Sequence, residues 1–298
     1  MTRLNHHRVG SGEPLVLVHG LGSRWQVWDR MIPALAERFD VIAVDLPGFG
    51  ASDPLPVTTV GTLTDALADF LAEEGIERPH LVGNSMGGYI SLSLGARGLA
   101  RSVTAFSPIG FWNTAGRVWC QQTMGKSLVL ARVLGPAMPK LLATTVGRTA
   151  FLYLVFGRPW ALDAQTAIET AQGAANAPAF ADACASFADV RFGELGALAD
   201  IPVTIAWGNR DVLLTYATQS KRARLALPTA RHRTLFGSGH TPFYDDPQGC
   251  SKILFEQFDA MERAAKDSAA TPRAGQDTEE VGTAESHAGN KSDAAREK

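Results

Sequence analysis

Residues 79–92 read PHLVGNSMGGYISL, and this stretch decides the fold. A short apolar run over residues 80–82 ends at Gly83, and a second apolar run begins at Tyr89. The pattern predicts a strand, a sharp turn with Ser85 at its apex, and then a helix. Glycines on both sides of the serine let the backbones pass closely, so the hydroxyl can be exposed in a strained turn. The stretch predicts a nucleophile, provided that a base and an oxyanion site lie nearby.

Strand-like and helix-like runs alternate outward from this stretch. Strand-like runs are found at residues 15–18, 41–44, 80–82, 103–106, 203–207 and 232–236. Helical patterns are found at residues 25–39, 62–74, 86–96 and 216–227. Several of the strand runs are apolar throughout, which is typical of a parallel sheet buried on both faces. The alternation predicts an α/β fold with a mostly parallel central sheet flanked by helices.

Residues 111–197 interrupt this alternation. They contain no clear strand, many alanines and several aromatic side chains, among them Trp112, Phe151 and Trp160. Ligands of α/β sheets bind at the carboxyl edge of the strands, so we interpret the segment as a helical cap, or lid, over that edge. The three named aromatics are then candidate substrate contacts. Extra helices of the core are the alternative.

This interpretation predicts the domain boundaries. A core made of residues 1–110 and 198–263 carries the cap, residues 111–197, between its two parts. Residues 264–298 contain one Val and no Leu, Phe, Trp or Tyr. Such a segment cannot bury enough apolar surface to order itself, so we expect a disordered C-terminal tail.

Composition argues against several classes of function. The chain has 298 residues and a formal net charge of −2, so no basic surface for nucleic acid is indicated. Its three cysteines are far apart and form no C-x-x-C motif, so neither a disulfide framework nor a zinc site is predicted. The first residues lack the apolar core of a signal peptide, and no apolar run approaches the ~20 residues that span a bilayer. We expect a cytoplasmic protein with a small-molecule substrate and with neither a metal nor an organic cofactor.

A serine nucleophile needs a base to take its proton and an acid to orient that base. Of seven histidines, His240 is the candidate base because it follows the last strand run and reaches the edge where Ser85 lies. Asp211 is the candidate acid, because it follows the preceding strand run on a different loop. The order Ser85, Asp211, His240 fits a strand-by-strand arrangement. For Asp211 the alternative is an ordinary turn carboxylate beside Arg210.

The charge that develops on the substrate oxygen requires main-chain donors, which form an oxyanion hole. We expect one donor from Met86, directly after the nucleophile, and the other from Leu21, in the turn after the first buried strand. Because these donors are backbone N–H groups, both side chains are free to line the acyl pocket. His19, at the start of the same turn, is interpreted as a structural brace.

These segments together resemble the α/β-hydrolase superfamily, in the branch of esterases, cofactor-free haloperoxidases and C–C bond hydrolases. The resemblance spans residues 9 to about 260 outside the 111–197 interval. It rests on residues 19–22, 45–52, 83–88, 208–211 and 239–240. The resemblance implies the α/β-hydrolase fold with a cap inserted before the acid-bearing strand. Serine at position 85 argues against the dehalogenases and epoxide hydrolases, which carry aspartate there.

Three functional hypotheses follow. The first is a serine hydrolase that cleaves an ester or thioester of a small apolar substrate through a Ser-His-Asp triad and an acyl-enzyme. The second keeps the triad but changes the reaction to C–C hydrolysis of a ring-cleavage product or to perhydrolysis by a cofactor-free haloperoxidase. The third is a small-molecule receptor, because the same fold can host other functions.

Overall fold

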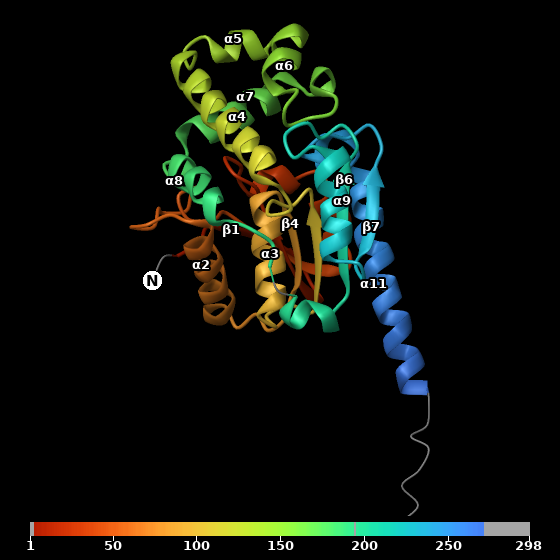
Figure 1. Ribbon diagram of the computed structural model, residues 1–298. Helices are drawn as coiled ribbons and strands as arrows, with labels where there is room; N and C mark the ends of the chain where they lie inside the picture. The colour runs from red at the N-terminus through yellow and green to blue at the C-terminus, as the bar shows by residue number, and fades with distance from the viewer. Residues whose placement is uncertain (1–2, 194, 271–298) are drawn as a thin grey trace, which may run out of the picture. The chain divides into compact units, whose positions relative to one another are not determined.

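The computed structural model describes residues 3–193 and 195–270 (Figure 1). Contacts divide the chain into a unit of residues 1–261 and a unit of residues 262–298. Helix α11 (Pro247–Ala270) continues past residue 263, where the sequence predicted the start of the tail. The remainder of that predicted tail, residues 271–298, lies outside the described residues.

A seven-stranded sheet forms the centre of the first unit. Its strands are β1 (His6–Gly10), β2 (Glu13–Val18), β3 (Phe39–Val44), β4 (His80–Asn84), β5 (Ser102–Phe106), β6 (Val203–Gly208) and β7 (Arg231–Leu235). They lie in the order β1-β3-β2-β4-β5-β6-β7, and every neighbouring pair is parallel except β1 with β3. The prediction of a mostly parallel sheet is confirmed, and β1 is an additional edge strand.

Helices pack on both faces of this sheet, so two apolar layers form. On one side Val16 of β2 lies in a layer with Leu67 of α2 (Val60–Glu73). On the other side Leu17, the next residue of β2, lies in a layer with Leu254 of α11. Successive residues of a strand point to opposite faces, and both faces are covered here. This double burial explains why the strand runs are apolar throughout instead of alternating.

The remaining core helices connect the strands. They are the 3-10 helix η1 (Trp25–Trp28), α1 (Ile32–Ala36), α3 (Met86–Ala96), α9 (Tyr216–Ala226), α10 (Pro242–Asp245) and the 3-10 helix η4 (Gly196–Asp200). The helix predicted over residues 25–39 is wrong in its extent, because the chain forms η1 and the short α1 there. Pro33 lies in the first turn of α1 and lacks the N–H that a continuous helix requires.

The segment 111–197 is helical, and its described residues contain no strand. It comprises α4 (Thr114–Val133), α5 (Met138–Leu142), α6 (Thr145–Leu152), the 3-10 helix η2 (Pro159–Ala161), α7 (Ala164–Asn176), α8 (Phe180–Ala185) and the 3-10 helix η3 (Ser186–Asp189). Three of the helices begin at residues whose side chains accept a backbone N–H, namely Asn113, Thr144 and Asp163. The segment has a small apolar core of its own, which includes Leu142 and Phe156.

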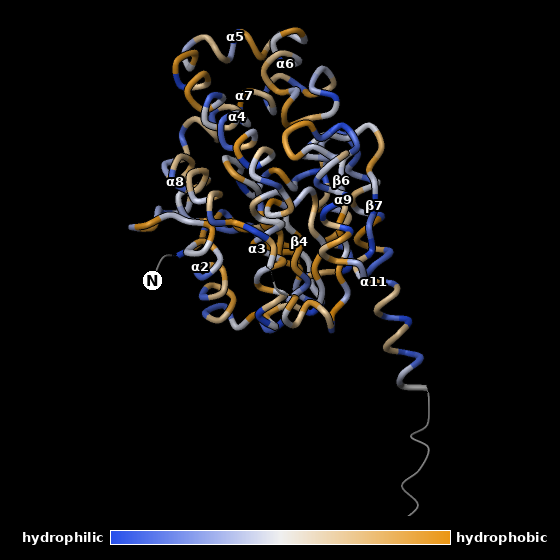
Figure 2. The backbone as a smooth tube through the Cα atoms, in the orientation of Figure 1, coloured by the Kyte–Doolittle hydropathy of each residue, from blue (hydrophilic) through white to orange (hydrophobic). Residues whose placement is uncertain are grey.

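Hydropathy varies from turn to turn along the helices of this segment, whereas the central strand β4 beneath them is largely apolar (Figure 2). None of the helices in the described part of the chain combines the length and the apolar character needed to cross a bilayer.

Candidate active site

Ser85 lies at the apex of a strained turn between β4 and α3. Its backbone dihedrals are φ 55° and ψ −115°, a region that residues other than glycine rarely adopt. A Cβ atom at Gly83 would collide with the carbonyl oxygen of Gly87, and one at Gly87 would collide with the carbonyl oxygen of Val18. Both glycines are therefore required for the turn to pass between its neighbours.

Hydrogen bonds fix the serine turn to the neighbouring loops. The Ser85 N–H donates to the carbonyl oxygen of Phe106 over 2.9 Å. The side-chain amide of Asn84 donates to the same oxygen and to the carbonyl oxygen of His240, both over 3.1 Å. Asn84 thus connects the strand that carries the serine to the loop that carries the candidate base.

Asp211 and His240 form a buried pair. The Asp211 Oδ2 accepts a hydrogen bond of 2.8 Å from the His240 Nδ1, and the two side chains are 0% and 6% exposed. The other carboxylate oxygen accepts the N–H groups of Leu213 and Leu214 over 3.0 and 2.8 Å. A carboxylate on Nδ1 holds the proton on that nitrogen, which leaves Nε2 able to accept one.

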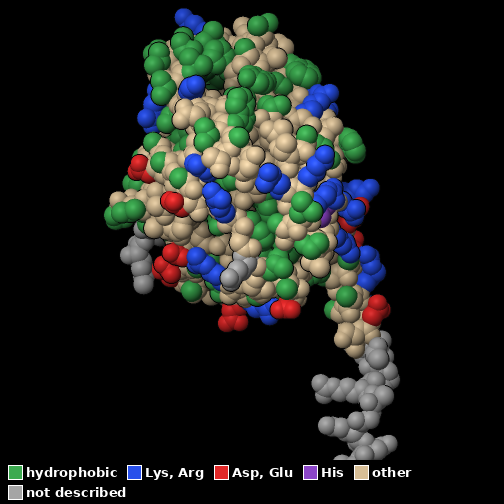
Figure 3. All heavy atoms as spheres, in the orientation of Figure 1, with side chains coloured by type: hydrophobic (Ala, Val, Ile, Leu, Met, Phe, Trp, Pro, Cys, Tyr) green, Lys and Arg blue, Asp and Glu red, His purple; other side chains and the backbone are tan. Residues whose placement is uncertain are grey.

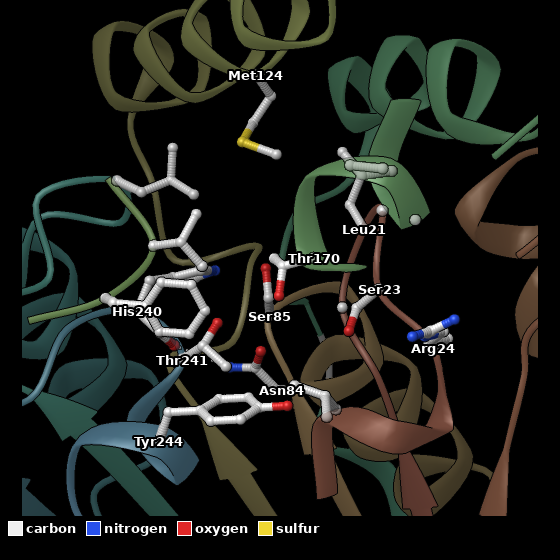
Figure 4. A pocket seen from close by; sticks show the side chains of 18 of the residues that line it. Leu21, Ser23, Arg24, Asn84, Ser85, Met124, Thr170, His240, Thr241 and Tyr244 are labelled. Carbon is white, nitrogen blue, oxygen red and sulfur yellow. Dashed lines mark hydrogen bonds between the residues drawn. The ribbon is translucent and has the colours of Figure 1, made fainter. Parts of the chain in front are cut away.

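Ser85 and His240 line one cavity of about 160 Å³ (Figure 4). The cavity lies between the carboxyl edge of the sheet and the helices α4 and α7 of the 111–197 segment, which contribute Met124 and Thr170. The structure therefore brings the three residues of the predicted triad to one edge of the sheet, from the loops after β4, β6 and β7.

The two expected oxyanion donors belong to segments that adjoin the serine. Gly20 approaches the turn so closely that a Cβ atom there would be 3.1 Å from the Cβ of Ser85, and Leu21 follows it and lines the cavity. Met86 is the first residue of α3, and the first N–H groups of a helix have no partner inside it. The Met86 side chain, however, is fully buried in the core and does not line the cavity, which corrects the expectation for that side chain.

His19 has the contacts of a structural residue. Its Nε2 accepts the N–H of Leu46 over 3.0 Å, and its Nδ1 donates to the carbonyl oxygen of Gly20 over 2.7 Å. Complete burial lowers the pKa of His19, so the neutral imidazole that this pattern requires is favoured. The side chain thereby connects the turn after β2 to the loop after β3.

Asp245 and Asp246, which follow the candidate base, contact main-chain groups. Asp245 ends α10, and its Oδ2 accepts the N–H groups of Gly157 and Gly239, each over 2.8 Å. Asp246 accepts the N–H of Gly249 over 2.9 Å, in the first turn of α11. Asp245 therefore joins the base loop to the 111–197 segment.

The three aromatic residues predicted as substrate contacts do not line the cavity, so this prediction is wrong. Trp112 is buried and donates its Nε1–H to the carbonyl oxygen of Val190 over 2.9 Å. Phe151 packs at the border of the segment's own core, and Trp160 is 48% exposed on the surface. Large apolar side chains from this segment line the cavity instead at Met124, Val155, Phe156 and Phe187.

One wall of the cavity is polar, which sequence reasoning missed. Arg24, on the loop after β2, forms an ion pair of 2.6 Å with Glu169 of α7, and the other Glu169 oxygen accepts from Gln165 over 2.7 Å. Asp29 lies on the same wall, and partial burial raises the pKa of its carboxyl group. Arg24 and Glu169 also line a second cavity, so the pair lies at the boundary between the two.

Comparison with known proteins adds to this geometry. A family model described as alpha/beta hydrolase fold matches residues 13–247. An uncharacterized protein of Mycobacterium tuberculosis is 28% identical over 283 residues, which are 88% of this chain and 80% of that protein. The 3-oxoadipate enol-lactonase 1 of Acinetobacter baylyi is 29% identical over 209 residues, which are 67% of this chain and 72% of that enzyme.

A solved structure has the same fold. A thermophilic esterase from Thermogutta terrifontis matches with a TM-score of 0.68 and 20% sequence identity, over 87% of this chain and 94% of that one.

Proposed function

This chain belongs to the alpha/beta hydrolase fold family, and from that premise we propose that it is a serine hydrolase acting on a carboxylic ester or thioester. The observation that carries the proposal is the 2.8 Å hydrogen bond between Asp211 and His240 beside the strained Ser85, all at one sheet edge. A carboxylate-oriented imidazole and a serine that line one cavity form the arrangement that acyl transfer requires.

The proposed reaction runs through an acyl-enzyme. His240 Nε2 takes the proton of the Ser85 hydroxyl as Oγ attacks the carbonyl carbon, and the N–H groups of Leu21 and Met86 stabilise the oxyanion. The tetrahedral intermediate collapses, the bond to the leaving oxygen or sulfur breaks, and His240 returns the proton to the leaving group. Water, deprotonated by the same imidazole, then attacks the acyl carbon and releases the acid and the free serine.

The walls of the cavity indicate the kind of substrate. Met124 and Phe156 provide an apolar side, which favours an apolar acyl or ring group. The Arg24–Glu169 pair provides a polar side, which favours a substrate that also carries a polar group. The lactonase relative supports ester chemistry, because a lactone is a cyclic ester.

Labelling with a small fluorophosphonate tests the nucleophile. Wild type should be labelled, and Ser85→Ala should lose labelling together with at least ~10³-fold in ester turnover. Ser23 lines the same cavity, so Ser23→Ala is the matched control and should keep both the labelling and the ester turnover. Labelling that survives in Ser85→Ala would show that the nucleophile is another residue.

A substrate panel separates the other hypotheses. Acyl esters, lactones and ring-fission dienones are offered to the same preparation. Turnover of the dienones without turnover of the esters would favour C–C hydrolysis. Saturable binding of a small molecule without turnover or labelling would favour a receptor.

A further inference from the structure

The first part of the helical segment is basic and contains no acidic residue. Residues 111–162 hold six Lys or Arg and no Asp or Glu, in a chain whose formal net charge is −2. The six are Arg117, Lys126, Arg132, Lys140, Arg148 and Arg158. In the described part of the chain none of them forms an ion pair.

Three of these cations serve the fold and three are exposed at the outer end of the segment. Arg148 is buried and donates to the carbonyl oxygens of Leu142 and Ala143 at the end of α5. The Arg117 side chain donates a hydrogen bond to the Gln121 Oε1, and the Arg158 side chain donates one to the carbonyl oxygen of Gly237, in the loop before the candidate base. The exposed three are Lys126, Arg132 and Lys140, and of these Arg132 also donates its Nε–H to the carbonyl oxygen of Ala175 near the end of α7 over 3.1 Å.

Exposed apolar side chains lie among these cations. Val129 and Val133 of α4 are 61% and 71% exposed, and Val146 of α6 is 80% exposed. On α4 the residues 126, 129, 130 and 133 have the spacing of one helix face, so Lys126 and the apolar side chains share it. Hydrophobic side chains gather over this end of the segment, with Lys and Arg beside them (Figure 3). We call the seven residues the apical face: Lys126, Val129, Leu130, Arg132, Val133, Lys140 and Val146.

The segment does not need the apical face for its own core. That core is formed by side chains such as Met138 and Leu142 on the inner sides of the helices. A second copy of the chain would also match the face poorly. In a two-fold interface each patch meets itself, and this one would bury three cations without an acidic partner.

We propose that the apical face docks on an anionic lipid surface. Apolar side chains on one side of a helix insert at the boundary between headgroups and acyl chains, and lysine and arginine beside them attract anionic headgroups. Val129, Leu130, Val133 and Val146 are the inserting side chains, and Lys126, Arg132 and Lys140 contact the headgroups. The docking is peripheral and does not depend on the reaction proposed above.

Sedimentation of the full chain with vesicles tests the proposal. The chain should sediment with vesicles that contain phosphatidylglycerol more than with phosphatidylcholine alone, and added salt should weaken this binding. Lys126→Gln alone should lower the partition coefficient on phosphatidylglycerol vesicles by roughly fivefold. The pair Lys126→Gln with Leu130→Ser should lower it further. Hydrolysis of a small dissolved ester and the circular dichroism spectrum should not change, because neither residue lines the cavity.

Helix α9 offers a matched control. Lys221 and Leu225 have the same spacing on a surface that is also basic, and Leu225 is 83% exposed. Lys221→Gln with Leu225→Ser should therefore leave vesicle binding near the wild-type value. The proposal is wrong if both pairs reduce binding equally, or if wild type does not prefer the anionic vesicles. The proposal is also wrong if the chain forms a dimer, or a complex with an acidic protein, in the absence of lipid, and if the substitutions on the apical face abolish that assembly while those on α9 do not.

Discussion

Asp211 shows how a single buried carboxylate organises the site. It accepts two N–H groups of its own loop on one oxygen and the His240 ring on the other, so each contact restricts the side chain. With the carboxylate in place, the imidazole keeps its proton on Nδ1. The role proposed for Asp211 is therefore to orient the base and to stabilise its charged form, and it exchanges no proton itself.

Asp211→Asn tests this role directly. Its Oδ1 can still accept the two loop N–H groups, but its NH₂ group then faces His240 and selects the wrong tautomer. We expect kcat to fall by roughly 10⁴-fold, which is a less complete loss than in Ser85→Ala, with the fold retained. Asp246→Asn is the matched control, because Asp246 contacts a helix N-terminus and not the imidazole. An unchanged rate in Asp211→Asn would contradict the assignment of the acid.

The Arg24–Glu169 pair predicts a dependence on substrate charge. Glu169→Gln removes a negative charge from the cavity that Ser85 lines and leaves the arginine without its carboxylate, so kcat/KM for anionic esters should rise relative to neutral esters. Arg24→Gln should shift the same ratio the other way. Both side chains are about one-third exposed or more, so stability should change little. Competition between one neutral and one anionic ester measures the ratio of their kcat/KM values. An equal ratio in the two variants would show that the Arg24–Glu169 pair does not select substrates by charge.

At the scale of elements, strands β2 to β6 could be predicted because they are largely apolar runs buried on both faces, whereas β7, with the sequence RHRTL, is polar and partly exposed. The edge strand β1 could not, because its sequence HHRVG is mostly polar and half exposed. The candidate triad residues lie in the loops that follow strands β4, β6 and β7, so their place at one sheet edge followed from topology. The cavity walls depend on which face of each helix turns inward and on pairs as distant as Arg24 and Glu169, 145 residues apart. Neither the inward face of a helix nor a contact between residues so far apart can be predicted from a short stretch of sequence.

The helical segment should determine which acyl groups the protein accepts. Met124 lines the cavity from α4, so Met124→Ala should enlarge the apolar side and shift preference toward longer acyl chains, by about fourfold in kcat/KM per added methylene. Trp160→Ala is the control, since Trp160 is exposed outside the cavity. Rates with a series of linear esters measure the preference. If all esters and the fluorophosphonate slowed by one common factor in Met124→Ala, the residue would support the scaffold and would not select substrates.

At the scale of the whole molecule, three buried or half-buried histidines predict sensitivity to acid. Burial lowers the pKa of His19, His80 and His232 in the folded chain. Below the ordinary histidine pKa of about 6.5 the unfolded chain binds more protons, so the free energy of unfolding falls as pH decreases from there. Melting temperatures from pH 7.5 down to about 5 measure this loss.

His232→Gln offers the matched comparison for the dependence of the melting temperature on pH. Its ring donates to the carbonyl oxygen of Leu227 at the end of α9, a contact that a glutamine amide can replace. The variant should therefore lose less stability than wild type over the same range of pH. A melting temperature that stays constant down to pH 5 in wild type would show that these histidines do not control stability.

The strand order has a consequence for synthesis on the ribosome. From β4 to β7 the strands lie side by side in the order in which they are translated, so each can add to an edge that already exists. The serine turn needs only β4, α3 and their neighbours, whereas His240 follows β7. A nascent chain thus carries its proposed nucleophile for most of its elongation and receives the proposed base near the end. The proposed mechanism therefore predicts that a newly made chain hydrolyses no ester until the last strand has joined the sheet.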